Sequence, residues 1–320
     1  MYESPKFHNT TTFKVHFVHY MYQNFINFTS INLFKTIKMS VDINKLEQTA
    51  TQVRRDIVRM VHGCQSGHPG CSLGCTDYFV ALYFHAMKHD PAFNMDGIGE
   101  DLFFLSNGHI SPVFYSTLAR AGYFPVSELA TFRKINTRLQ GHPTTHEHLP
   151  GIRIASGSLG QGLSAAIGAA QAKKLNKDNS LVYVLMGDGE LQEGQVWEAA
   201  MYAPHNKVDN LIAAVDYNGA QIDGSTDHVL SLGNLRAKWE AFGWDVLEVE
   251  KGNDMASVIA GIEEAKSLTG NGKPIIILLH TAMGAGVDFM MGTHKWHGVA
   301  PNDEQLASAL NQLPETLGDY

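Results

Sequence analysis

Two short polar turns, each directly after an apolar run, carry residue types that bind metal ions and phosphates. The run 181–186 ends in a Gly-Asp-Gly sequence centred on Asp188, and the run 211–215 is followed by Asn218, thirty residues beyond that aspartate. Apolar runs of this length and β-branched content predict buried strands. Ligands of an open parallel sheet bind beyond the carboxyl ends of its strands, so we expect the carboxylate and the carboxamide to converge there.

These oxygen donors suit a hard divalent cation. Mg²⁺ prefers carboxylate, carboxamide and carbonyl oxygens together with the phosphates of its ligand. Gly189 allows a diphosphate to approach the backbone closely. Because a lone Gly-Asp-Gly sequence also forms ordinary surface turns, the prediction of a metal and diphosphate site depends on the second strand.

Histidines recur in glycine-containing turns. His68, His109 and His142 each follow a glycine, and His294 and His297 lie between glycines in the segment 292–298. An imidazole on such a turn can transfer protons near neutral pH. The alternative for each is a histidine that only hydrogen-bonds within its turn. The last two are three residues apart, as on one helix face, but the flanking glycines favour a loop.

The Gly-Ser-Leu-Gly-Gln-Gly sequence at 157–162 opens a helix rich in small residues. A ligand or a neighbouring backbone can approach such a segment closely. Its spacing, Gly-x-x-Gly-x-Gly, differs from the dinucleotide fingerprint Gly-x-Gly-x-x-Gly, and no strand precedes it. We therefore reject a dinucleotide site there.

The three cysteines, Cys64, Cys71 and Cys75, are too few and too close together for a disulfide framework. They also lack the paired spacing of a structural zinc site, which favours a role as small core residues. Neither a secretory signal nor an apolar run of about 18 residues is visible, so we expect a cytoplasmic protein with no membrane span.

Composition disfavours two classes of partner. Of 320 residues, 44% are hydrophobic, and 24 Lys and Arg against 32 Asp and Glu give a net charge of −8 without a basic stripe. Such a charge disfavours nucleic acid and anionic membranes as partners. A phosphorylated ligand must then be held by local groups.

Further apolar runs and helical periodicities alternate along the chain. Three more strands are predicted at 101–105, 244–249 and 275–280. Helices are predicted at 42–62, 76–86, 113–121, 191–203, 255–267 and 303–313. This alternation predicts an α/β fold with a doubly wound, mainly parallel sheet and helices on both faces.

The first 38 residues differ from the rest, because they contain no glycine and no lasting periodicity. A mitochondrial transit peptide would be rich in arginine, and no arginine precedes Arg54. We therefore expect residues 1–38 to be an appended segment that is disordered or not native. A single domain would then begin at Met39 and extend to Tyr320.

Taken in order, these motifs resemble the amino-terminal, thiamine diphosphate-binding half of transketolases. The motifs are Ser-Gly-His-Pro-Gly at 66–70, Ser-Asn-Gly-His at 106–109, Gly-His-Pro at 141–143, the glycine-rich sequence at 157–162, Gly-Asp-Gly to Asn at 187–218, and Gly-Thr-His at 292–294. Each alone is weakly specific, whereas six in this order are strongly so.

The resemblance implies three sets of site residues. Those acting on the sugar or on protons would be His68, His142, His294 and Glu193, the last at a subunit interface. Those contacting the cofactor would be His109, Gly157, Ser158, Leu159, Gly189, Asn218 and His294. The metal, Mg²⁺ with Ca²⁺ or Mn²⁺ as substitutes, would be held by Asp188, Asn218 and the backbone carbonyl of Ala220.

Two departures from the family pattern affect the cofactor site. Ser158 stands where the family usually has proline, and the Gly-Ala pair at 219–220 is smaller than usual. Neither removes a side-chain ligand, since Ala220 would bind through its carbonyl. The departures bear on the affinity for the cofactor.

The resemblance also implies a partner. In the full-length family the glutamate that activates the cofactor lies in a second domain, and this chain ends soon after the first. It would be the amino-terminal subunit of a split transketolase of the pentose phosphate pathway. It would transfer two-carbon ketol units between sugar phosphates, in a heterotetramer with a companion chain that carries the pyrimidine-binding domain.

Three alternatives stay open. The chain could be the matching part of a 1-deoxyxylulose-5-phosphate synthase, a 2-oxoacid dehydrogenase α subunit, or a noncatalytic regulatory subunit. The set of histidines favours transketolase over the first two. The presence of every expected metal and substrate side chain disfavours the last.

Overall fold

A computed structural model describes residues 41–320, and residues 43–320 form one compact unit. The predicted appended segment 1–38 and the predicted start at Met39 lie outside the described residues. The predicted domain from 39 onward therefore corresponds to the described unit, apart from its first residues.

Five parallel strands form the central sheet, in the order β1-β2-β3-β7-β6. The strands are β1 (Leu102–Leu105), β2 (Val182–Gly187), β3 (Leu211–Asp216), β6 (Asp245–Val249) and β7 (Ile275–Leu279). Every residue of β1, β3 and β7 is buried, as expected for strands covered on both faces. The five predicted strands and the parallel sheet are confirmed.

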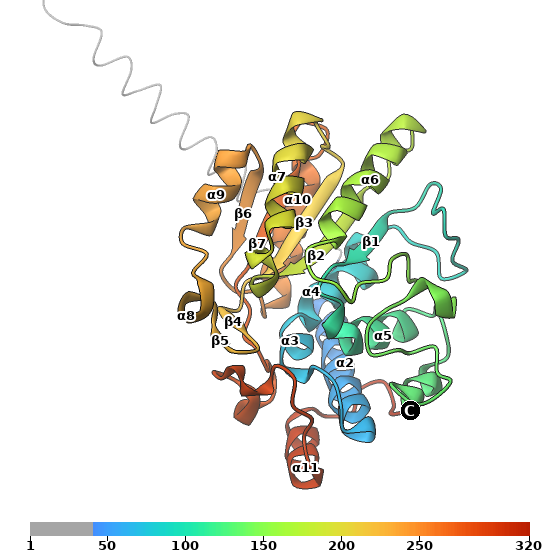
Figure 1. Cartoon of the computed structure of the whole chain (residues 1–320). Helices are drawn as coiled ribbons and strands as arrows, with labels where there is room; N and C mark the ends of the chain where they lie inside the picture. The colour runs from blue at the N-terminus through green and yellow to red at the C-terminus, as the bar shows by residue number, and fades with distance from the viewer. Residues whose placement is uncertain (1–40) are drawn as a thin grey trace, which may run out of the picture. The chain divides into compact units, whose positions relative to one another are not determined.

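Helices cover both faces of the sheet (Figure 1). Within residues 41–320 the α-helices are α2 (Ile43–Cys64), α3 (Pro69–Gly74), α4 (Thr76–Ala81), α5 (Ser111–Arg120), α6 (Gly162–Leu175), α7 (Gly194–His205), α8 (Thr226–Leu230), α9 (Leu235–Phe242), α10 (Met255–Leu268) and α11 (Asp303–Gln312). Short 3₁₀ segments lie at Gly108–Ile110, Val126–Thr131, Thr145–Glu147, Gly189–Gln192, Asp288–Met290 and His294–Trp296, and a π-helical turn at Leu82–Ala86. The prediction of helices on both faces is confirmed.

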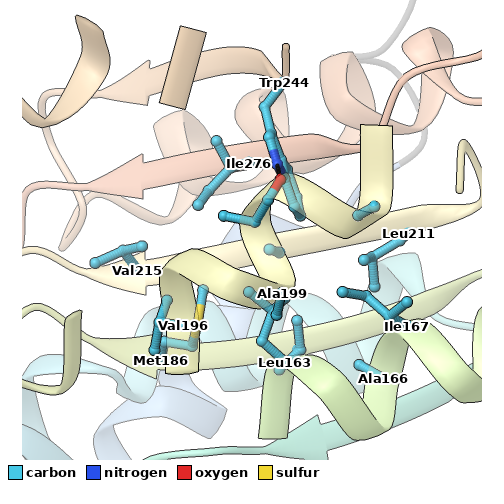
Figure 2. Packing of buried hydrophobic residues seen from close by; sticks show 14 of the residues in the cluster. Leu163, Ala166, Ile167, Met186, Val196, Ala199, Leu211, Val215, Trp244 and Ile276 are labelled. Carbon is cyan, nitrogen blue, oxygen red and sulfur yellow. Dashed lines mark hydrogen bonds between the residues drawn. The ribbon is translucent and has the colours of Figure 1, made fainter. Parts of the chain in front are cut away.

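One face of the sheet packs against α6, α7 and α9. In Figure 2, side chains from α6 and α7, such as Ile167 and Ala199, face the strands that carry Met186 and Val215. Alanines on these helices let them approach the sheet closely. The buried Trp244 adds its indole to this cluster, and its Nε1 donates to the Ala200 carbonyl at 2.8 Å.

The opposite face packs against an aromatic layer from the first helices. Phe103 of β1 contacts Phe79 of α4 and Phe114 of α5, both with ring centroids 5.4 Å apart. Alternate residues of each strand thus bury against different helix layers. Of the helices in residues 41–320, none combines the length and apolar character that a membrane span requires.

Three local features differ from the sequence prediction. The helix predicted at 76–86 ends in a π-helical turn from Leu82, and a 3₁₀ turn at Gly189–Gln192 precedes α7. Pro69 begins the short helix α3, where we predicted a continuing loop. Proline suits the first helical position because the amide it lacks has no partner there, so the turn and the helix start overlap.

Candidate active site

The carboxyl ends of β1, β2 and β3 meet at one cavity of about 350 Å³. Each strand is followed by a polar turn that contributes to this cavity, as the strand-end pattern predicted. Its lining includes ten of the predicted site residues: His68, His109, His142, Gly157, Leu159, Asp188, Gly189, Glu193, Asn218 and Ala220. Two predicted residues, Ser158 and His294, do not line it and are exposed.

Asp188 is a buried carboxylate at the end of β2, only 1% exposed. Its Oδ1 accepts from the Gly189 amide at 2.7 Å and its Oδ2 from the Gly219 amide at 2.6 Å. Gly219 adopts φ +72°, which glycine reaches without strain, and this turn aims its amide at Asp188. Burial, and then the neighbouring Asp216 carboxylate, raise the pKa of Asp188 to about 8.

Asp216, the last residue of β3, is a second buried carboxylate in the lining that the sequence analysis did not identify. It accepts from the Asn218 carboxamide Nδ2 at 2.8 Å and from the Thr281 hydroxyl. Burial raises the pKa of this carboxyl group. Asp216 thereby fixes the carboxamide of Asn218, whose Oδ1 also accepts from the Ala220 amide at 2.9 Å.

Asn107 was also missed as a site residue. It follows β1, is 1% exposed and lines the cavity, yet neither its Nδ2 nor its Oδ1 has a hydrogen-bond partner. A buried carboxamide without partners costs free energy unless a ligand satisfies it. Its place in a motif that we had quoted was the available signal, but only the fold shows that the side chain is buried and unpaired.

Glu190 connects the polar turns to one another. Its Oε1 accepts from the Ser106 hydroxyl and from the Gly160 amide at 2.7 Å, and its Oε2 from the Gly187 amide at 3.1 Å. One buried carboxylate thus joins the ends of β1 and β2 to the glycine-rich turn before α6. Burial raises the pKa of Glu190.

Four histidines gather on the other side of the cavity. The His68 ring centroid lies 5.1 Å from that of His109, 6.4 Å from that of His142 and 5.6 Å from that of His297. His109 and His297 stack at 5.1 Å. The histidine cluster, as we call these four residues, comes from four separate segments, and three of the four were predicted.

The fold keeps the histidine cluster neutral. Burial lowers the pKa of His68 to about 4, with smaller contributions from His297, Arg133 and His142. Burial also lowers the pKa of His109, His142 and His297. Neutral imidazoles can accept or donate a proton at a hydroxyl group, which is the chemistry of general acid–base catalysis.

His297 occupies the position in the cluster that we expected for His294. The 3₁₀ turn His294–Trp296 directs the two histidines differently, so that His297 joins the cluster while His294 lines an adjoining cavity of about 580 Å³. His297 lines both cavities. Spacing alone does not determine which histidine of such a pair points inward.

The cysteines have the core role that was predicted. Cys71 and Cys75 are buried, and all three cysteines are free thiols. Burial raises the pKa of both buried thiols well above its usual value, which leaves them unreactive.

The residues present fit a divalent cation and a diphosphate. Asp188 and Asp216 are two adjacent buried carboxylates, and neither has an ion pair with a Lys, Arg or His of residues 41–320. A cation beside them would offset the cost of burying their charge. The unpaired carboxamide of Asn107 and the backbone of the Gly-Asp-Gly turn offer hydrogen bonds to an anionic ligand in the same cavity.

An all-parallel α/β domain with such a cavity beyond its strand ends is of the class that binds thiamine diphosphate. A family described as "Transketolase, thiamine diphosphate binding domain" matches residues 46–315. The chain therefore belongs to the transketolase family and corresponds to its amino-terminal half. The resemblance inferred from the six motifs is confirmed.

Relatives of similar length are separate subunits. One of the two subunits of the apulose-4-phosphate transketolase of Phocaeicola vulgatus is 38% identical over 277 residues, which are 87% of this chain and 96% of the relative. "6-deoxy-6-sulfo-D-fructose transketolase subunit SqwG" of Clostridium sp. is 38% identical over 268 residues, 84% of this chain and 96% of the relative.

Solved transketolases share the fold. The enzyme from Leishmania mexicana superposes with a TM-score of 0.78 at 32% identity, covering 84% of this chain and 41% of that one. The enzyme from Campylobacter jejuni gives a TM-score of 0.77 at 34% identity, covering 86% and 43%. The chain thus spans about two fifths of these solved structures.

Proposed function

We propose that this chain is the amino-terminal subunit of a split transketolase that transfers two-carbon ketol units between sugar phosphates. The observation that carries the proposal is the single cavity that joins the acidic turn of Asp188 and Asn218 to the histidine cluster. A diphosphate and metal site beside neutral imidazoles suits a cofactor reaction on hydroxylated substrates. The relatives that are subunits of matching length support a split enzyme.

Asp188, Asn218 and the backbone carbonyl of Ala220 would hold Mg²⁺, or Ca²⁺ or Mn²⁺ in its place. His109, Asn107 and the backbone of Gly189 would contact the diphosphate. Gly157 and Leu159, which line the cavity, would contact the aminopyrimidine, as the resemblance implies. When bound, thiamine diphosphate supplies the electron sink for breaking a carbon–carbon bond beside a carbonyl.

His68, His142 and His297 would orient the sugar and move protons at its hydroxyl groups. Their pKa values are lowered, so the neutral forms needed for this role prevail at pH 7. His294 borders the adjoining cavity, where it would contact the outer part of the substrate. The exposed Glu193, at the start of α7, would take part in a proton relay at a subunit interface.

The companion chain would carry the pyrimidine-binding domain and the activating glutamate. The chain spans 41% of a solved transketolase, which supports a second subunit that supplies the remainder. We propose a heterotetramer. A cytoplasmic location stays a prediction, which the three free thiols favour.

The anionic sugars named for the relatives, apulose 4-phosphate and 6-deoxy-6-sulfofructose, support an anionic sugar as the substrate of this chain. The cavity that adjoins the histidine cluster contains Lys295 as well as His294, which suits such a group.

Purification of the chain with and without its companion subunit tests the proposal. Ketol transfer from xylulose 5-phosphate to ribose 5-phosphate should be undetectable for the chain alone and should appear on mixing with the companion subunit, thiamine diphosphate and Mg²⁺. Robust transfer by the chain alone would show that the site is complete without a partner, and no transfer by the mixture would contradict the reaction class.

A further inference from the structure

Arg133 lies beneath the histidine cluster and joins two of its turns. Its Nη1 donates to the Ser66 hydroxyl at 2.7 Å, two residues before His68. Its Nη2 donates to the Gly141 carbonyl at 3.3 Å, one residue before His142. One guanidinium group therefore contacts both segments that present these imidazoles, although it does not line the site cavity.

The local backbone is built around this side chain. Arg133 has φ +56°, a left-handed conformation that side chains other than glycine adopt rarely. Its amide nonetheless donates to the Leu139 carbonyl at 2.9 Å, which closes the loop that follows the Val126–Thr131 segment. A Cβ atom on Gly141 would lie 2.9 Å from the guanidinium carbon, so glycine is needed for the guanidinium group to fit.

The charge of Arg133 has no carboxylate partner among residues 41–320, and its Nε is buried without a hydrogen bond. Arg138, five residues later, shows the ordinary surface arrangement, since both of its donors pair with Glu128 at 2.8–2.9 Å. An unpaired, half-buried cation repels a second positive charge nearby. The imidazoles of His68 and His142 are the groups that this cation faces.

We infer that Arg133 is a positioning residue, which holds the His68 and His142 turns in register and keeps both imidazoles neutral for proton transfer. The two hydrogen bonds fix the distance between the turns, and the unpaired charge opposes protonation. The direction of the pKa shifts agrees, because Arg133 contributes to lowering the pKa of both histidines, after burial in each case. The other titratable groups facing His68 are His297 and His142, with His109 in ring contact.

The role in turnover rests on the proposed function, whereas the effect on the imidazoles does not. The experiment therefore has two arms. In the first, the chain is labelled at histidine Cε1, and the pKa values of His68 and His142 are measured by NMR titration, with assignments from His68→Gln and His142→Gln. In the second, turnover of the assembled enzyme is measured.

Arg133→Gln should raise the pKa of both histidines by on the order of half a unit or more. It should lower turnover by roughly tenfold to a hundredfold, because the turns lose their common anchor. Arg133→Lys should keep both pKa values close to wild type but recover only part of the turnover, since lysine cannot make the paired contact. Arg138→Gln should change neither quantity.

Unchanged pKa values for both histidines in folded Arg133→Gln would overturn the inference, even if turnover fell. If Arg133→Gln does not fold, Ser66→Ala decides, because it removes one anchor and leaves the charge. Lower turnover with an unchanged His68 pKa supports the inference, and wild-type turnover overturns it. Absence of ketol transfer in every variant and in wild type would count against the proposed function, while the NMR arm would still test Arg133.

Discussion

Two buried aspartates, Asp56 and Asp188, show how differently one protein treats the same side chain. Asp56 of α2 is fully buried, and it accepts from Arg120 Nε and Nη2, both at 2.9 Å, and from the Ser116 hydroxyl at 2.8 Å. Asp188 is as deeply buried, but it receives only backbone amides and faces a second carboxylate.

The difference separates a structural region from a functional one. Between α2 and α5 the chain supplies the cation that its buried carboxylate needs, so that region is complete. At the carboxyl edge of the sheet, the carboxylates of Asp188 and Asp216 and the carboxamide of Asn107 lack such partners. Polar groups that the chain itself leaves unsatisfied mark the place for a cation and an anionic ligand.

The largest expected effect is on catalysis at the functional edge. His68→Ala should retain the cofactor but lose turnover by about 10² to 10⁴, the range usual for removing a general acid or base. Steady-state kinetics and cofactor titration of the assembled enzyme would measure both. His228→Ala, which changes an exposed histidine outside the cavity, is the control. A wild-type rate in His68→Ala would leave His68 as a turn residue.

The structural region should respond in stability. Asp56→Ala leaves the Arg120 guanidinium buried without its carboxylate, so the free energy of unfolding should fall by about 3–5 kcal/mol. Chemical denaturation of the full chain would measure this loss. Glu128→Ala, which breaks the more exposed pair with Arg138, should cost no more than about 1 kcal/mol. Equal losses in the two variants would erase the distinction between the regions.

Asn107→Ala should have the opposite pattern to Asp56→Ala. Since the buried carboxamide has no partner in the protein, the variant should unfold at the same temperature as wild type or higher, while its affinity for thiamine diphosphate should fall by about 1–3 kcal/mol. Asn210→Ala is the control, because Asn210 donates to the Ala170 carbonyl at 2.9 Å away from the cavity. A thermal destabilisation by Asn107→Ala, with cofactor affinity unchanged, would count against this interpretation.

The smallest effect concerns pH. The folded-state pKa of His68 is about 4, below its ordinary value near 6.5, so the unfolded chain binds more protons between these values. The free energy of unfolding should therefore fall as pH decreases from 6.5 to 4, and His68→Gln should fall less steeply. Urea denaturation at several pH values would measure both slopes. Parallel slopes would show that His68 is not kept neutral by the fold.

The sequence predicted the sheet because each strand is an apolar run that stops at glycines or polar residues. The end of β2 at Asp188 and the end of β3 before Asn218 were both visible in this way. The helix α9 and the short hairpin of β4 (Ala220–Gln221) and β5 (Gly224–Ser225) were not predicted. The strands of this hairpin are only two residues long, too short for a periodic signal.

The parts of the site that escaped prediction depend on tertiary contacts. Whether His294 or His297 enters the cluster is decided by a 3₁₀ turn. The importance of Asn107 lies in partners that it does not have, and that of Arg133 in two turns far apart in the sequence. Residue types and spacing identified the chemistry, but burial and pairing, which need the fold, show where it is incomplete.

Calorimetric titration of thiamine diphosphate into the assembled enzyme, with and without Mg²⁺, tests most directly whether Asp188 awaits a cation. We expect Asp188→Ala to abolish Mg²⁺-dependent cofactor binding without unfolding the domain, because a group at a strand end contributes little to the core. Asp209→Ala, which removes a surface partner of Lys174, should bind as wild type does. Unchanged Mg²⁺-dependent affinity in Asp188→Ala would contradict the account.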